Sequence, residues 1–177
     1  MLEMARLVGT PPEGIILQTR ARNYLANSQS CEPDATIRAR YDRLRRKHFL
    51  WVSRKPACGV YNCFGLVWAS RRTAIYEESD ISQILTDDGY RQLVTDSQLR
   101  PGDVVLYRYP GNTLHAAMVV ELKPLVTSTV PWVLSKWGPA FGEDLHALLD
   151  VPENFEGCMI EFWTDRPLVP CIIYSFG

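Results

Sequence analysis

The fold is decided by the stretch Leu99-Arg100-Pro101-Gly102-Asp103-Val104-Val105-Leu106-Tyr107. Its first half has the composition of a turn, and its apolar second half is typical of a buried strand. A second turn, Tyr109-Pro110-Gly111-Asn112, leads into another apolar run over residues 115–122. Further strands are predicted over residues 131–137, 157–163 and 170–176. We therefore expect a meander of antiparallel strands joined by short loops.

Helices are predicted mainly before this meander. Asp34 has the character of an N-cap and precedes a basic segment whose apolar residues recur at helical spacing. Asn62 is likewise suited to cap a helix over residues 63–72, because its short side chain can accept from an unpaired amide. Two shorter helices are predicted over residues 77–85, capped by Ser79, and over residues 142–149.

This order of elements predicts one α+β domain over residues 1–177, with N-terminal helices packed on a central antiparallel sheet. We expect residues 1–56 to form an N-terminal arm and the basic helix. Residues 57–177 should form the core of the domain. A chain of 177 residues with high aromatic content is long enough to bury a substantial core.

Charge is distributed unevenly along the chain. Residues 1–55 contain 11 Lys or Arg and 5 Asp or Glu, whereas the whole chain has a formal net charge of −1. We interpret the basic run over residues 38–47 as a solvated helix face, with contact to an anion or nucleic acid as the alternative. Nucleic acid is not the expected partner, since aromatic residues are not interleaved with this run.

The cysteines and the apolar runs indicate the compartment. The five cysteines are Cys31, Cys58, Cys63, Cys158 and Cys171. An odd count without a signal peptide predicts reduced thiols and a cytoplasmic location, and the spacing fits no common metal motif. No apolar run approaches the length of a membrane span. An exported protein without a signal peptide would need a non-classical or specialised secretion route.

Cys63 and His115 are the residues with the clearest chemical potential. At the first position of a helix, a thiol lies near unpaired N–H groups that favour the thiolate and can hold an oxyanion. His115 precedes an apolar strand, where its ring could face a helix terminus and act as a base. A small buried cysteine and a turn histidine are the structural alternatives.

Three segments resemble the NlpC-type branch of papain-like cysteine peptidases. These segments are Asn62–Trp68, Leu99–Val105 and His115–Val120. They resemble, respectively, that family's cysteine-bearing helix start, its Leu-x-Pro-Gly-Asp segment and its histidine strand. Residues 135–146 also resemble a Ser-Lys-x-Gly…His stretch of little-characterised bacterial relatives. The resemblance implies a papain-like fold, with Cys63 as nucleophile and His115 as base.

The third residue of the implied site is left open. Ser135 is the best positional match, on the strand after the histidine strand, and Asp144 and His146 are the alternatives. The expected pocket residues are Tyr61, Asn62, Phe64, Tyr107, Lys136 and Trp137. The family commonly has Asp and Ser where this chain has Asn62 and Phe64, which leaves the substrate class open.

The resemblance implies a cysteine hydrolase, a thiol peptidase or amidase that cleaves an amide bond in a peptide or cell-wall peptide. No metal or other cofactor is expected. A deamidase or acyltransferase, acting as an effector toxin with an immunity or carrier protein as partner, is one alternative. A non-catalytic binding module on the same fold is another.

Overall fold

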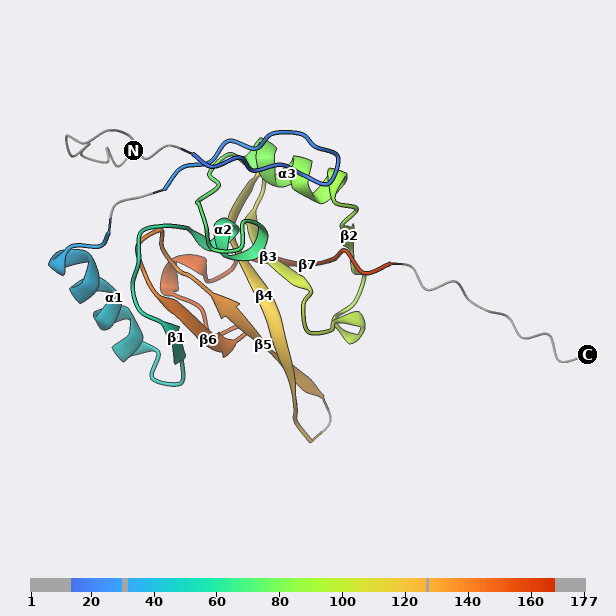
Figure 1. Cartoon of the computed structure of the whole chain (residues 1–177). Coiled ribbons are helices and arrows are strands. Elements are labelled where there is room, and N and C mark those ends of the chain that lie inside the picture. Colours follow the sequence, from blue (N-terminus) through green and yellow to red (C-terminus); the bar gives the residue numbers. More distant parts are fainter. Residues whose placement is uncertain (1–13, 30–31, 127, 168–177) are drawn as a thin grey trace, which may run out of the picture.

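The structure, a computed structural model, describes residues 14–29, 32–126 and 128–167 (Figure 1). Its helices are α1 (Ala35–Lys47), α2 (Cys63–Trp68) and α3 (Glu78–Asp87), with 3-10 turns at Asp96–Gln98 and Glu153–Phe155. Its strands are β1 (Val52–Lys55), β2 (Arg91–Gln92), β3 (Val104–Tyr109), β4 (Asn112–Pro124), β5 (Thr129–Ser135), β6 (Glu143–Ala147) and β7 (Met159–Thr164).

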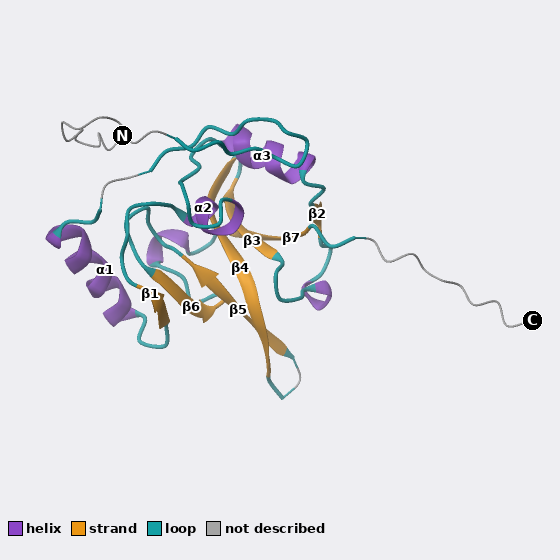
Figure 2. Ribbon diagram, in the orientation of Figure 1, coloured by secondary structure: helices purple, strands orange, loops and turns teal. Residues whose placement is uncertain are grey.

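All of these strands belong to one antiparallel sheet, in the order β1-β6-β5-β4-β3-β7-β2. The predicted hairpin of β3 and β4 is present, with Tyr109 paired to Asn112 and Val104 to Met118. In Figure 2, α1 lies beside the β1 end of the sheet, whereas α3 lies beyond α2. The predicted α+β class with an antiparallel sheet is confirmed.

The two faces of this sheet bury different sets of side chains, because successive residues of a strand point to opposite sides. Leu106 of β3 and Ala116 of β4 belong to the apolar cluster that includes α2. Tyr107 and Ala117, one residue further along each strand, belong to a cluster with Trp137. We call the first side the α2 face and the second side the aromatic face.

The two caps predicted from the sequence are confirmed. The Asp34 side chain accepts from the amide of Ile37 at the start of α1, and the Asn62 side chain accepts from the amide of Gly65 at the start of α2. Asn62 also ties the helix start to the following segment, since its Nδ2 donates to the carbonyl of Ile75. Its position as an N-cap fixes Cys63 as the first helical residue.

The second helix is shorter than predicted. It ends at Trp68 rather than near residue 72, because Ser70 and Arg71 have positive φ angles of 49° and 65°. The amide of Arg71 turns back to the carbonyl of Gly65, which closes the helix. The chain then passes so close to Gly65 that a Cβ there would lie 1.9 Å from the carbonyl oxygen of Thr73.

The prediction of a helix over residues 142–149 was wrong, because residues 143–147 form β6 between β1 and β5. Its polar residues Glu143, Asp144 and His146 are all buried, on both faces of the sheet, which hides the usual strand pattern. Ser79 does not cap α3, whose N-cap is Glu77. The strand predicted over 131–137 ends at Ser135, and the one predicted over 170–176 lies outside the described residues.

Candidate functional site

Cys63 lies at the start of α2, on the α2 face, where it packs in the same cluster as Phe64 and Ala116. It is 8 % exposed. Burial raises the pKa of the Cys63 thiol to about 11, and hydrogen bonds with the backbone of Ala116 and Phe64 oppose this only in part. The helix terminus predicted from the sequence is present, but desolvation outweighs it and favours the neutral thiol.

His115 lies on the aromatic face. It is directly opposite Tyr107 in the β3–β4 register, and opposed residues share a face. Its ring stacks on Trp137 with centroids 4.1 Å apart, and the residue is 1 % exposed. Burial lowers the pKa of His115 well below its usual value, with a smaller contribution from His146. Its Nε2 has no hydrogen-bond partner among the described residues.

The structure therefore does not bring Cys63 and His115 together. The strand β4 carries both His115 and Ala116, and only Ala116 faces Cys63. A bulge explains why the face of His115 was not predictable: Tyr107 pairs with His115, but Arg108 pairs with Thr113, so one residue of β4 is unmatched. This extra residue sets the face on which the histidine lies.

Ser135 and His146 do contact each other, on the aromatic face. His146 Nε2 lies 2.8 Å from Ser135 Oγ, and Nδ1 lies 2.8 Å from the carbonyl oxygen of Ala147. Because a carbonyl only accepts, Nδ1 carries the proton, and Nε2 accepts from the serine hydroxyl. Burial lowers the pKa of His146 to about 4, which keeps this ring neutral. Ser135 thus orients His146 rather than His115.

Asp144, the other alternative for the third residue, contacts neither histidine in the described part of the chain. Its carboxylate accepts from the hydroxyl of Tyr41 at 2.7 Å and lies 3.2 Å from Nε of Arg45. Both partners belong to α1. Asp144 therefore anchors α1 to β6.

The predicted pocket residues are divided between the two faces. Tyr61, Phe64 and Lys136 lie on the α2 side with Cys63, and Asn62 is the helix cap. Tyr107 and Trp137 lie on the aromatic face, where the Tyr107 hydroxyl donates to the carbonyl of Leu148. These side chains do not line one common pocket.

Sequence reasoning missed a buried charged network on the α2 side. Glu143 accepts from the Tyr61 hydroxyl at 2.5 Å and from Arg71 Nε and Nη2 at 2.6 and 3.2 Å. These hydrogen bonds lower the pKa of Glu143 although burial opposes them. The adjacent acids Glu143 and Asp144 were the available signal in the sequence. Because consecutive residues of a strand point to opposite faces, one of the two must face each side of the sheet.

A groove lies between α1 and β1, at the edge of the sheet. Its volume is about 400 Å³. The residues that line it are Arg38, Tyr41, Asp42, Arg45, Ser53, Arg54, Lys55, Pro56 and Ala57. Part of the basic run, interpreted from the sequence as a solvated face, therefore borders a concave surface.

Neither a cluster of metal ligands nor a helix able to span a membrane is found in residues 14–29, 32–126 and 128–167. Within these ranges, no group of three or more His, Cys, Asp or Glu side chains is placed to hold a metal ion. No helix in the same ranges combines the length and apolar character that crossing a bilayer requires.

Comparison with known proteins gives no match: no family model fits the sequence, no curated protein is significantly similar to it, and no solved structure is significantly similar to its fold. The function is therefore inferred from the geometry of the described residues.

Proposed function

We propose that this chain is a binding domain whose groove between α1 and β1 takes a small polyanionic ligand. The observation that carries the proposal is the concentration of cations around a concave surface. Arg38, Arg45, Arg54 and Lys55 line the groove, against one exposed acid, Asp42.

The geometry supports recognition of oxygen anions. Arg38 and Arg45 are seven residues apart on α1, which places them on one side of the helix, two turns apart. Arg54 and Lys55 follow on β1, whose residues are all exposed. Guanidinium groups bind carboxylate and phosphate oxygens through paired N–H donors, and a lysine adds a point charge, so the three arginines and one lysine can hold several anionic groups of one ligand.

The availability of these cations also supports the proposal. Arg45 is paired with buried Asp144. Arg38, Arg54 and Lys55 form no ion pair with any residue that the structure describes. An anion can thus bind them without displacing a protein carboxylate.

The size and shape of the groove favour a small molecule over an added peptide strand. A volume near 400 Å³ lies within the range of small-molecule sites. The exposed strand β1 is short, charged and bulged between Ser53 and Lys55. These features protect an edge strand against pairing with another strand.

The cysteine hydrolase and its papain-like fold stay predictions from the sequence. That hydrolase needs a thiol and an imidazole in contact, and Cys63 and His115 lie on opposite faces. The binding domain needs no such contact. The sequence left open a non-catalytic binding module on the implied papain-like fold and, separately, contact of the basic run over residues 38–47 with an anion; the proposed groove is closer to the second alternative.

The test is calorimetric titration of the full chain with inorganic triphosphate and with citrate, at low and at physiological salt. We expect binding that weakens with salt, and at least about tenfold weaker binding in the double variant Arg38→Gln/Arg54→Gln. Arg43→Gln removes an exposed arginine of the same helix that does not line the groove, and it should leave binding nearly unchanged.

Two results would overturn the proposal. The first is that neither triphosphate nor citrate binds at low salt. The second is an equal loss of affinity in the double variant and in Arg43→Gln, because this would show attraction to net charge rather than to the groove.

A further inference from the structure

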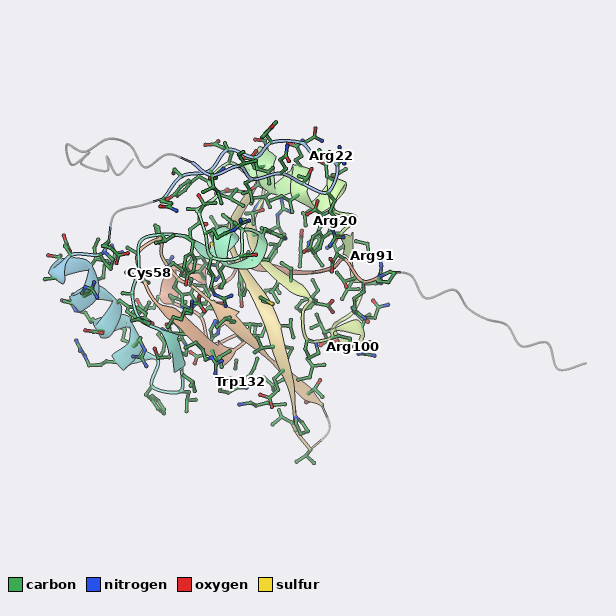
Figure 3. All side chains as sticks on the ribbon, viewed as in Figure 1. Arg20, Arg22, Cys58, Arg91, Arg100 and Trp132 are labelled. Atoms are coloured by element: carbon green, nitrogen blue, oxygen red, sulfur yellow. The ribbon has the colours of Figure 1, made fainter. Side chains whose placement is uncertain are left out.

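We propose that Cys58 and Lys136 form an oxidant-dependent modification site, in which oxidised Cys58 becomes covalently bonded to the Lys136 amine. Cys58 lies on the segment between β1 and α2 (Figure 3), and Lys136 directly follows β5. The two residues are 78 positions apart, and Lys136 Nζ lies 3.8 Å from Cys58 Sγ.

The surroundings of Lys136 aim its nitrogen at the sulfur. Nζ donates to the carbonyl oxygen of Cys58 at 2.9 Å and to the carbonyl oxygen of Phe141. A tetrahedral amine has four directions, one of which is the Lys136 side chain itself. Two of the other directions are taken by the carbonyl acceptors, and the third points to the thiol sulfur, toward which the protonated amine donates. In a neutral amine, this direction can hold the lone pair.

Burial favours the neutral form of the Lys136 amine. Lys136 is 1 % exposed, and desolvation lowers its pKa, although the nearby groups Cys58 and Glu143 oppose this shift. Glu143 does not form an ion pair with Lys136, because its oxygens are occupied by Tyr61 and Arg71. Among the residues that the structure describes, no carboxylate forms an ion pair with the Lys136 amine.

The thiol, in contrast, is open to a small oxidant. Cys58 is partly exposed, whereas Cys63, the first residue of α2, is buried. Thiol oxidation by peroxide follows accessibility and thiolate character. A partly exposed cysteine and a buried lysine thus meet, with Sγ and Nζ 3.8 Å apart.

The chemistry has two steps. Hydrogen peroxide transfers one oxygen to the thiolate, so that an S–O bond forms, the O–O bond breaks, and water leaves after protonation; Cys58 is oxidised by two electrons and the peroxide is reduced. The Lys136 lone pair then attacks the sulfur, forming an S–N bond as the S–O bond breaks. The departing oxygen leaves as water with a proton from the nitrogen. Sulfenic acids condense with backbone nitrogen in the same way.

The link would fix the segment that precedes α2 to the end of β5. It does not depend on the proposed ligand of the groove, because the readout is a covalent mass and not an affinity. Failure of either proposal leaves the other standing.

The test is peptide mapping by mass spectrometry of the full chain after treatment with hydrogen peroxide. We expect a linked pair of peptides containing Cys58 and Lys136 as a main product, with a mass about 2 Da below the sum of the two peptides. Dithiothreitol should cleave the link and restore the two unmodified peptides. Cys63→Ser should retain the linked pair, which distinguishes it from a disulfide. Lys136→Arg should lose it, because a guanidinium has no available lone pair.

The wild-type map decides the matter even where Lys136→Arg fails to fold. Cys58 recovered as sulfinic or sulfonic acid with an unmodified Lys136 would overturn the proposal. A Cys58–Cys63 disulfide, a linked pair of any other mass, or an unreacted Cys58 would also overturn it.

Discussion

The α2 face and the aromatic face of the sheet both bury polar side chains, but they do so differently. On the α2 face, Glu143 keeps its charge because Arg71 and Tyr61 donate to it. On the aromatic face, His115 and His146 lie among tryptophan rings, and burial lowers the pKa of each. The α2 face therefore buries a charged Glu143 between its donors, whereas the part of the aromatic face that is lined by tryptophans buries neutral imidazole rings.

This difference shows why a cysteine and a histidine on neighbouring elements need not be in contact. Cys63 belongs to one face and His115 to the other, and β4 lies between them. Burial raises the pKa of the thiol and lowers the pKa of the ring, so it favours the neutral form of both groups. Cys63 and His115 are therefore close to the same strand but separated by the thickness of the sheet.

The largest effect is expected from the paired ion. Glu143→Ala should lower the free energy of unfolding by about 3–5 kcal/mol, because it leaves Arg71 and Tyr61 without their buried acceptor. Urea denaturation measures this loss. Glu153→Ala, which removes the exposed partner of Lys47, is the matched control and should leave the midpoint unchanged. Equal midpoints for both variants would contradict the buried network.

Replacement of the two histidines by phenylalanine should lower the free energy of unfolding by different amounts. His146→Phe removes the acceptor of a buried serine hydroxyl and should cost about 1–3 kcal/mol of unfolding free energy. His115→Phe replaces a ring whose Nε2 has no partner among the described residues, and it should cost less. Denaturation of both variants at pH 7.5 gives the comparison. A larger cost for His115→Phe would indicate a hydrogen bond at that ring.

A smaller effect is expected from pH. The unfolded chain protonates its histidines near pH 6.5, whereas folded His146 has a pKa of about 4. The folded state binds fewer protons, so its stability is complete above pH 6.5 and is lost as pH falls toward 4. We expect a loss of about 1 kcal/mol from this residue between pH 6.5 and 5.5. Denaturation of wild type and His146→Phe isolates this contribution; parallel pH profiles would contradict it.

The sequence predicted those features that depend on local chemistry. The caps Asp34 and Asn62 and the hairpin after Gly102-Asp103 were placed correctly, because short-range hydrogen bonds and turn residues determine them. The α+β order followed from the same signals. These features need no knowledge of which residues meet in space.

The site was less predictable because the face of a strand depends on register. One unmatched residue at the start of β4 decides where His115 points. Polar residues buried on both faces made β6 resemble a helix. The contact of Cys58 with Lys136 joins elements far apart in sequence, and no motif marks it.

The pH dependence of alkylation at Cys63 tests the separation of the two faces most directly. A pKa of about 11, against an ordinary value of 9.0, predicts that Cys63 labels slowly with iodoacetamide near neutral pH and that its rate still rises above pH 9. His115→Ala should leave this profile unchanged, as read by mass spectrometry of the Cys63 peptide. Rapid labelling at mildly acidic pH that is lost in His115→Ala would contradict the account, because it would require the thiol and the imidazole to meet.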